Sequence, residues 1–449
     1  MIYTTNLVEL PSYLHIGTFE DDRKQRRKKL EIEKHHDTND SRVFSHIIGD
    51  KNFLVVGELY LDLLYTKLMS RLIGVEQLGI VKGYKMFTGA NQNRYYHSVD
   101  TGIRMECAAR KCSSYDEDVD ICIAAGLLHD AYVPPFSDIG NFGRKNGIDE
   151  EIEITRIKDD EEVMSVLEKH KIDPDAVIDT IRGEHKYLGQ LLNSKNGLDV
   201  DGISYTLIDS FFAVPIYMRS VEEFRRFVSN PQLHYIHEEI IIDDNGEIKF
   251  TDAYNLRDFL TLRSHMWAGV YKSSPHRARC VFFEKMMSEF WGKNDISDDE
   301  FLQMSDFDFK KLLDKKINSK YDKGILENIF SCLMTDRFEE IDRIYDSEQL
   351  HESIEKAKKT YGDAVVVRKQ KGFKAATQTL VKIPEGLESS VHEDWKGLEM
   401  MIEDGDDIVT FDEYVPFERV FPDASKEIEK TSDEKTYTGL YIDKERIEV

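Results

Sequence analysis

From residue 45 to about residue 340, the sequence is a succession of amphipathic segments with the period of an α-helix and few turn signals between them. The segment GELYLDLLYTKLMSRLIGV carries a stripe of leucines at intervals of three and four, namely Leu61, Leu64, Leu68 and Leu72. The segment YYHSVDTGIRMECAARKC repeats this pattern with Val99, Ile103 and Cys107. The chain is therefore expected to be mainly α.

Two stretches depart from the helical pattern. The segment EEIIIDDNGEIKFTD has two short β-rich runs around Asp244, Asn245 and Gly246, which predicts a small β-hairpin inserted between helices. After about residue 345, strand-like pieces such as DAVVVRKQKGFK, TQTLVKIP and DIVTFDEYVP predict a smaller α+β appendage with an acidic tail. We expect a charged segment over residues 1–45, a helical domain over 46–345 and the appendage over 346–449.

Composition limits the location and the partners of the chain. The 449 residues are 41% apolar, which suffices for a substantial core. The longest strongly apolar stretch, residues 121–128, is far shorter than the roughly 20 residues of a membrane-spanning helix. The amino terminus does not have the pattern of a signal peptide, so we expect a cytoplasmic protein without a membrane partner.

The charge and the cysteines exclude other classes. A formal charge of -25 opposes general nucleic-acid binding, so a polyanionic ligand needs a specific site. The basic run at residues 23–29 is interleaved with acids and is read as a solvated helix followed by a loop. Five cysteines without a CxxC pair indicate reduced thiols, mostly in the core, rather than disulfides or a zinc ribbon.

A histidine-aspartate doublet is the first candidate for chemistry. In ICIAAGLLHDAYVPPFSD, a helix that is apolar on nearly every side runs into His129 and Asp130 before two prolines stop it. Neighbouring side chains diverge by about 100° on a helix, but at a helix end both can turn toward one metal ion. By itself the doublet is weak evidence, because a helix-terminal aspartate is often only structural.

Two further segments supply partners for this doublet. His97 lies 32 residues upstream of His129, in the opening of the amphipathic helix that begins after NQNR. In LDVDGISYTLIDSFF, the residues Asp201, Tyr205 and Asp209 are spaced so that one helix face presents a carboxylate, a phenol and a second carboxylate. That face could simply turn to water, but the flanking apolar residues favour burial.

Together these segments resemble the HD superfamily, and within it the deoxynucleoside triphosphate triphosphohydrolases. RLIGVEQLG followed by FTGANQNRYYHS resembles the opening pattern of that family, and LLHDAYVPPFSD resembles its metal-binding H-D element. NGLDVDGISYTLID resembles the element N-G-(I/L)-D-V-D-x-x-x-Y-x-x-x-D, and LRSHMWAGVYKSSPHRA resembles a later R-x-x-x-H-x-x-x-Y helix, with the histidine displaced to His265. The resemblance covers residues 48 to 340.

The resemblance implies a role for each matching position. It implies a divalent metal ion, which is Mn²⁺, Mg²⁺, Fe²⁺, Zn²⁺ or Ni²⁺, bound by four residues that are also catalytic: His97, His129, Asp130 and Asp201. It implies that Arg94 and Arg263 hold phosphate oxygens, a role that suits the guanidinium fork. It implies that the base and sugar of a nucleotide contact a third set: Gln77, Leu78, Tyr205, Asp209 and Tyr271. The implied reaction is attack of water at the α-phosphorus, which releases a deoxynucleoside and tripolyphosphate.

The sequence departs from the family at two histidines of the H-D element. These positions are Val133 and Asp138. A carboxylic acid acts as a general acid only if burial or a neighbouring charge raises its pKa. Asp138 is therefore a candidate catalytic acid, with a helix cap as the alternative.

These departures leave three functions open. The chain hydrolyses dGTP or dNTPs generally, hydrolyses another phosphate ester such as another nucleotide or a nucleic-acid end, or is a nucleotide-binding regulatory protein with weakened catalysis. The resemblance also implies a homo-oligomer with a nucleotide effector.

Overall fold

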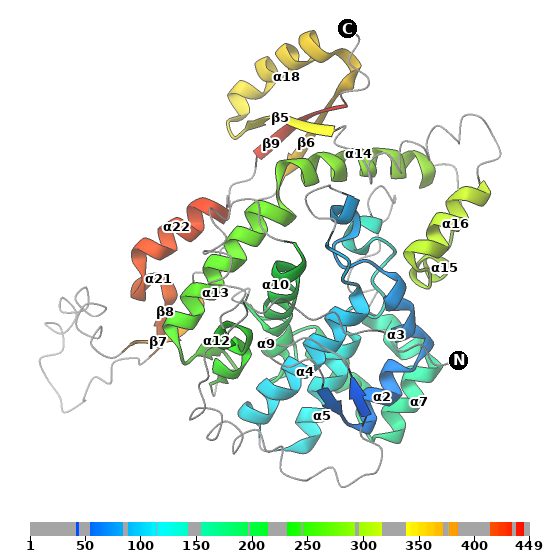
Figure 1. Cartoon of the computed structure of the whole chain (residues 1–449), viewed down its shortest axis with the longest axis vertical. Helices are drawn as coiled ribbons and strands as arrows, with labels where there is room; N and C mark the ends of the chain where they lie inside the picture. The colour runs from blue at the N-terminus through cyan, green and yellow to red at the C-terminus, as the bar shows by residue number, and fades with distance from the viewer. Residues whose placement is uncertain are drawn as a thin grey trace, which may run out of the picture.

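The computed structural model is predominantly helical, and the expected mainly α class is confirmed (Figure 1). It describes residues 42–44, 54–83, 89–113, 115–141, 154–195, 198–213, 231–243, 246–291, 296–316, 338–370, 376, 378–384, 414–432 and 437–443. Most of the predicted segment 1–45, including the basic run, therefore lies outside the described residues. No helix in the described ranges is long and apolar enough to cross a membrane.

The leucine stripe is divided between two short helices and the 3-10 turn that follows them, rather than lying on one helix. Helix α2 (Glu58–Leu64) ends at Tyr65, and α3 (Lys67–Arg71) starts after Thr66, whose hydroxyl caps it by accepting the Met69 N–H. All four leucines of the stripe are buried, as expected: Leu61, Leu64, Leu68 and Leu72. Before them, strands β1 (Arg42–Phe44) and β2 (Leu54–Val56) pair antiparallel.

Three helices at the centre of the fold carry the residues that the sequence singled out. They are α4 (Arg94–Cys112), α5 (Asp116–Leu128) and α10 (Val200–Phe212). Helices α4 and α5 lie close because glycines meet at their contact: a Cβ on Gly126 would lie 2.8 Å from the Gly102 Cα. This approach aligns the start of α4 with the end of α5.

The buried stripe predicted for α4 is correct in the first half of the helix and wrong toward its C-terminal end. Val99 is buried and Ile103 packs partly against the core, but Cys107 is exposed. The buried face continues instead along Arg104, Met105 and Ala108. The helix buries polar as well as apolar residues, so hydrophobic periodicity misplaces the buried face by part of a turn.

The remaining helices complete the fold. Helix α13 (Ala253–Met266) continues through the π-helical turn η7 (Trp267–Tyr271) and is followed by α14 (Ser274–Trp291). The other α-helices are α7 (Glu161–Lys169), α8 (Pro174–Ile181), α9 (Gly189–Leu192), α12 (Pro231–His234), α15 (Asp298–Leu302), α16 (Asp306–Lys316), α18 (Ser347–Tyr361), α21 (Phe417–Val420) and α22 (Pro422–Ser432). The 3-10 turns are η1 (Leu72–Gly74), η2 (Gly79–Gly83), η4 (Ser137–Asn141), η5 (Arg156–Asp159), η6 (Ile236–Glu239) and η8 (Gly362–Ala364).

The predicted hairpin is confirmed, and it joins a larger sheet. Strands β3 (Ile240–Ile242) and β4 (Ile248–Phe250) pair antiparallel, with Gly246 at a positive φ in the turn between them. Strand β7 (Leu380–Lys382) then pairs parallel with β4, and β8 (Tyr414–Pro416) pairs antiparallel with β7. The hairpin is therefore half of a sheet whose other strands come from the C-terminal region.

The C-terminal region contributes to two places in the fold. Strands β5 (Phe338–Ile344), β9 (Tyr437–Asp443) and β6 (Val365–Gln370) form a second sheet, which packs with α18 beside α14, whereas α21 and α22 lie along α13 (Figure 1). The predicted division at residue 345 stays a prediction, but strand pairing crosses it, because β5 precedes that residue and pairs with β9.

Candidate metal centre

Four side chains from α4, α10 and the end of α5 converge on one point. The Nε2 atoms of His97 and His129 lie 3.2 Å apart, and Oδ1 of Asp201 lies 2.9 Å from the first and 3.3 Å from the second. Oδ2 of Asp130 lies 3.5 Å from Nε2 of His97 and 3.4 Å from Nε2 of His129. The structure thus brings together the four side chains that the sequence predicted as metal ligands, and their binding of a metal stays a prediction.

A contact with the backbone determines which ring nitrogen of His129 carries the proton. Its Nδ1 lies 2.8 Å from the carbonyl oxygen of Gly126, which can only accept a hydrogen bond. In a neutral imidazole, Nδ1 therefore carries the proton and donates it, and Nε2 presents its lone pair to the cluster. This is the tautomer that binds a metal through Nε2.

The charges of the cluster stabilise one another. Burial lowers the pKa of His129, but the carboxylates of Asp130 and Asp201 outweigh burial and hold that pKa well above its usual value. Burial raises the pKa of Asp201, yet the two imidazoles hold it below its usual range. The site therefore contains ionised carboxylates that face imidazoles across distances suitable for a shared cation.

The donor set fits a divalent cation. The ligand atoms of His97, His129 and Asp201 all lie within 4.8 Å of one another, so this group could hold a metal ion. Oδ1 of Asp201 is buried and accepts no hydrogen bond from the described residues, although it faces both imidazoles. Two imidazole nitrogens and two carboxylates are a mixed nitrogen and oxygen set that suits several divalent ions.

Arg94 lies beside this centre and is oriented by two partners. Its Nη1 donates to Oδ2 of Asp130 at 2.5 Å, and its Nε donates to Oγ of Ser137 at 2.9 Å. Burial raises the pKa of Asp130, but Arg94 and then His129 oppose this effect and hold the pKa well below its usual value. The Arg94 guanidinium therefore lies next to the position that a substrate bound to the metal would occupy.

Residues that are distant in the sequence hold the loop that follows His129 and Asp130. Phe136 and Ser137 both have positive φ angles, of 64° and 59°, a conformation that costs free energy in residues other than glycine. Asp306 on α16 accepts the Phe136 N–H at 2.6 Å, and Arg71 donates to the Ala131 and Val133 carbonyls at 2.8 Å each. These contacts maintain the strained loop that presents Ser137 to Arg94.

Val133 and Asp138, which the sequence singled out as departures from the resembled pattern, are only partly described. Val133 is buried, so it offers no polar group at that position. The backbone of Asp138 belongs to η4, but its side chain lies outside the described residues. The role of Asp138 as an acid or as a cap stays a prediction.

A second cluster lies further along α10. Oδ2 of Asp209 accepts the Tyr271 hydroxyl at 2.7 Å, and Oδ1 accepts Nε2 of Gln92 at 2.8 Å. Burial raises the pKa of Asp209 to about 6, although both hydrogen bonds lower it. The ring of Tyr205 meets that of Tyr271 edge to face at 5.9 Å between centroids.

This second cluster connects to the metal centre through Arg263. Burial raises the pKa of Tyr205, while Arg263 opposes this by its charge and a hydrogen bond. Asp199 caps α10, and burial followed by repulsion from Asp201 raises its pKa to about 7. Arg263 lowers that same pKa, so its guanidinium acts on both clusters.

Gln77 and Leu78 lie outside this direct network. The Gln77 backbone N–H donates to the Gln92 carbonyl, and Gln77 Oε1 is buried without a hydrogen bond from the described residues. Leu78 packs partly buried against the core. Gln77 was predicted to contact the nucleotide, whereas Gln92, the residue that contacts Asp209, was not predicted. The available signal for Gln92 was its position in the sequence, two residues before Arg94.

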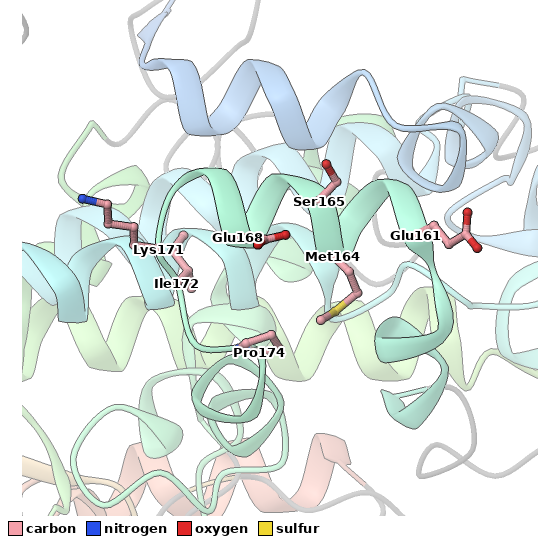
Figure 2. Close-up of a pocket in the computed structure, with 7 residues that line it drawn as sticks. All are labelled: Glu161, Met164, Ser165, Glu168, Lys171, Ile172 and Pro174. Atoms are coloured by element: carbon pink, nitrogen blue, oxygen red, sulfur yellow. The ribbon is translucent and has the colours of Figure 1, made fainter.

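A pocket elsewhere in the molecule is separate from these residues. Figure 2 shows it along α7 and the turn that follows, where Met164 and Pro174 approach each other. Its lining residues are Glu161, Met164, Ser165, Glu168, Lys171, Ile172 and Pro174. None of the metal-centre residues lines it, so its position does not indicate where the chemistry takes place.

The part of the chain that carries these four side chains is similar to a known family. The profile of the HD domain matches residues 94–208, which run from the start of α4 into α10 and contain all four ligands.

Known proteins are similar to this chain over different lengths. An uncharacterized protein of Bacillus subtilis (strain 168), YwfO, is 27% identical over 241 residues, which span 51% of this chain and 52% of that protein, about half its length. A hypothetical protein from Aquifex aeolicus has a similar structure, with a TM-score of 0.65, 17% identity, and coverage of 91% of this chain and 98% of that one. A phosphohydrolase from Bacteroides thetaiotaomicron has a TM-score of 0.63 at 16% identity, covering 89% and 100%. At these identities the structural similarities establish the fold alone.

Proposed function

We propose that this protein is a metal-dependent phosphohydrolase that converts deoxynucleoside triphosphates into deoxynucleosides and tripolyphosphate. The observation that carries the proposal is the convergence of the His97 and His129 Nε2 atoms on Oδ1 of Asp201, a buried oxygen that accepts no hydrogen bond from the described residues. A structurally similar protein from Bacteroides thetaiotaomicron is a phosphohydrolase, which supports the class of reaction.

The protein groups around the centre suit a phosphate ester. A bound divalent ion supplies Lewis-acid polarisation of a phosphoryl oxygen and lowers the pKa of a water molecule. Arg94 lies against Asp130, so its guanidinium is placed to donate to oxygens of a phosphate bound at the metal. Arg263 is buried and its charge lowers the pKa of both Tyr205 and Asp199, so we assign it to a second part of the same phosphate chain.

The cluster around Asp209 supports a nucleotide rather than a simple phosphate ester. A carboxylate with acceptor capacity, two tyrosines and the Gln92 carboxamide lie along α10 from the metal ligands. Carboxylates and carboxamides accept hydrogen bonds from sugar hydroxyls, and tyrosine rings pack against sugars and bases. We assign Asp209 and Gln77 to the 3′-hydroxyl and the tyrosines, with Leu78, to the sugar and base.

Protonation of the leaving group is the least defined step. The valine at position 133 has no proton to give, so we propose Asp138 as the acid. Asp138→Ala is expected to lower the rate with little loss of nucleotide binding, and an unchanged rate would exclude this role.

One assay tests the proposed reaction. The purified protein is incubated with each dNTP and Mn²⁺ or Mg²⁺, and tripolyphosphate and deoxynucleoside are measured. Product is expected from the wild type and is expected to disappear in His129→Ala and Asp201→Ala. His170→Ala is the matched control, because His170 contacts Asp62 of α2 through a hydrogen bond after the end of α7, outside the site. Product from the two site variants would contradict the assignment.

The buried valine at position 133 favours a second candidate, a nucleotide-binding regulatory protein with weakened catalysis. It predicts no turnover with any divalent ion but a dNTP-dependent rise in melting temperature. Turnover of another nucleotide or of a nucleic-acid end, without dNTP turnover, would indicate a different HD phosphohydrolase. Homo-oligomerisation and a nucleotide effector stay predictions.

A further inference from the structure

His97 is held by a chain of buried polar side chains behind the metal centre. Its Nδ1 lies 3.2 Å from Oγ of Ser204 on α10, and this hydroxyl donates to Oδ2 of Asp100 at 2.7 Å. Asp100 is in turn paired with Arg104, whose Nε donates to the same Oδ2 at 2.7 Å. All four residues are at most 1% exposed, so water does not compete for these hydrogen bonds.

The chemistry of this chain determines the direction of each hydrogen bond. A carboxylate paired with a guanidinium accepts hydrogen bonds, so the Ser204 O–H points toward Asp100. The Ser204 oxygen is then an acceptor for an N–H at Nδ1 of His97. With the proton on Nδ1, the Nε2 lone pair of His97 faces Asp201 and the metal position.

Arg104 lies at the end of this series of hydrogen bonds that is farthest from the metal centre. Its Nη1 donates to the His234 carbonyl at 2.6 Å and lies 2.9 Å from Nδ1 of His237, beyond α12. The guanidinium is thus held on two sides, by Asp100 on its own helix and by the segment from α12 to η6. A buried charge held in this way keeps its partner in one rotamer.

The two metal-binding histidines are held by different means. The Nδ1 of His129 donates to a backbone carbonyl, which no substitution of the acceptor side chain can remove, whereas His97 depends on a serine hydroxyl. We propose that Ser204 and Asp100 are positioning residues that keep His97 in the Nδ1–H tautomer required for metal binding, with Arg104 orienting Asp100. This inference rests on the metal centre of the proposed function.

Mn²⁺ alone is the probe for the test. The affinity of the full-length wild type for Mn²⁺ is compared with that of Ser204→Ala, and the loss of the hydroxyl is expected to weaken binding about 10- to 100-fold. Ser210→Ala is the matched control, because Ser210 is a buried serine on the same helix that donates to the Leu207 carbonyl. Ser204→Thr, which retains a hydroxyl, is expected to recover most of the affinity.

A second measurement separates this inference from the proposed function. In ¹⁵N-histidine-labelled, metal-free wild type at alkaline pH, long-range ¹H–¹⁵N spectra are expected to show the proton of His97 on Nδ1, with the signal assigned from a His97→Gln variant. A proton on Nε2 would overturn the inference even if Ser204→Ala fails to fold. Equal Mn²⁺ affinity in wild type and folded Ser204→Ala would overturn it too. If the wild type does not bind Mn²⁺, both the metal centre and the positioning role of Ser204 and Asp100 are overturned. If it binds Mn²⁺ but does not turn over dNTPs, only the proposed reaction is overturned.

Discussion

Nη1 of Arg94 lies 2.5 Å from Oδ2 of Asp130, the same oxygen that faces the two metal-binding imidazoles. One carboxylate oxygen thus connects the phosphate-binding candidate to the metal centre. A ligand that carries negative charge enters this arrangement beside both a cation and a guanidinium. The consequences of this geometry can be measured.

The first prediction concerns the shape of the Arg94 side chain. Arg94→Lys keeps the positive charge but loses the fork that contacts Asp130 and Ser137 together. We expect kcat/KM for the hydrolysed dNTP to fall about 100-fold while Mn²⁺ binding is retained. Steady-state kinetics and Mn²⁺ titration of the same preparation measure the two effects. Wild-type kcat/KM in the lysine variant would show that the fork is not used.

The second prediction concerns pH and substrate binding. Burial raises the pKa of Asp209 to about 6, so its carboxylate loses acceptor capacity as the pH falls through that value. We therefore expect KM for a dNTP to rise below about pH 6. Tyr271→Phe removes a donor to the ionised form, which raises the pKa and moves the transition to higher pH. Tyr205→Phe, which leaves both Asp209 hydrogen bonds in place, should not move the midpoint; equal midpoints in all three proteins would contradict the assignment.

The third prediction concerns stability. Burial raises the pKa of Asp306 from 3.8 to about 6 in the folded protein, despite the Phe136 and Glu76 N–H groups that it accepts. The folded state thus binds more protons between these values, so this residue's contribution is most favourable below pH 3.8 and is lost as the pH rises through 6. The expected loss is about 3 kcal/mol.

Urea unfolding of wild type and Asp306→Asn at several pH values tests this. The asparagine variant does not titrate, so its stability relative to wild type should increase with pH across that window. The titration of other groups cancels in the difference between the two proteins. A difference that stays constant with pH would show that Asp306 does not titrate in this range.

The fourth prediction concerns the contact between α4 and α5. A Cβ on Gly126 would lie 2.8 Å from the Gly102 Cα, a distance that forces the helices apart. Gly126→Ala is expected to lower the free energy of unfolding by about 1–3 kcal/mol and to weaken Mn²⁺ binding, because the helices carry different ligands. Gly89→Ala is the control, since its Cβ would meet its nearest atom at 3.4 Å. Equal unfolding curves for both variants would refute this account.

The sequence by itself predicted the helical class, the leucine stripe and the hairpin, and it singled out the four candidate metal ligands that the fold brings together. Each of these is a local signal: a period of three to four residues, a turn motif, or a short pattern around His97, His129, Asp130 and Asp201. The ligands could be found because each lies at or near the end of a strongly patterned helix.

Other features depended on the tertiary structure, because they join residues that have no local pattern in common. No pattern in the sequence indicates that Asp306 supports the loop of Phe136 from 170 residues away, or that Gln92 contacts Asp209. Strand β7 pairs with the hairpin across the predicted division for the same reason.

Polar burial is the second limit on prediction from sequence. Cys107 was expected inside and lies outside, whereas the charged Arg104 is almost completely buried on the same helix. A charged side chain is buried in the core only when a partner such as Asp100 compensates its desolvation. This compensation depends on the distance between the two charged groups, which is set by the fold. The sequence thus determined which residues can bind a metal, and the packing of α4 against α5 and α10 decided how they are held.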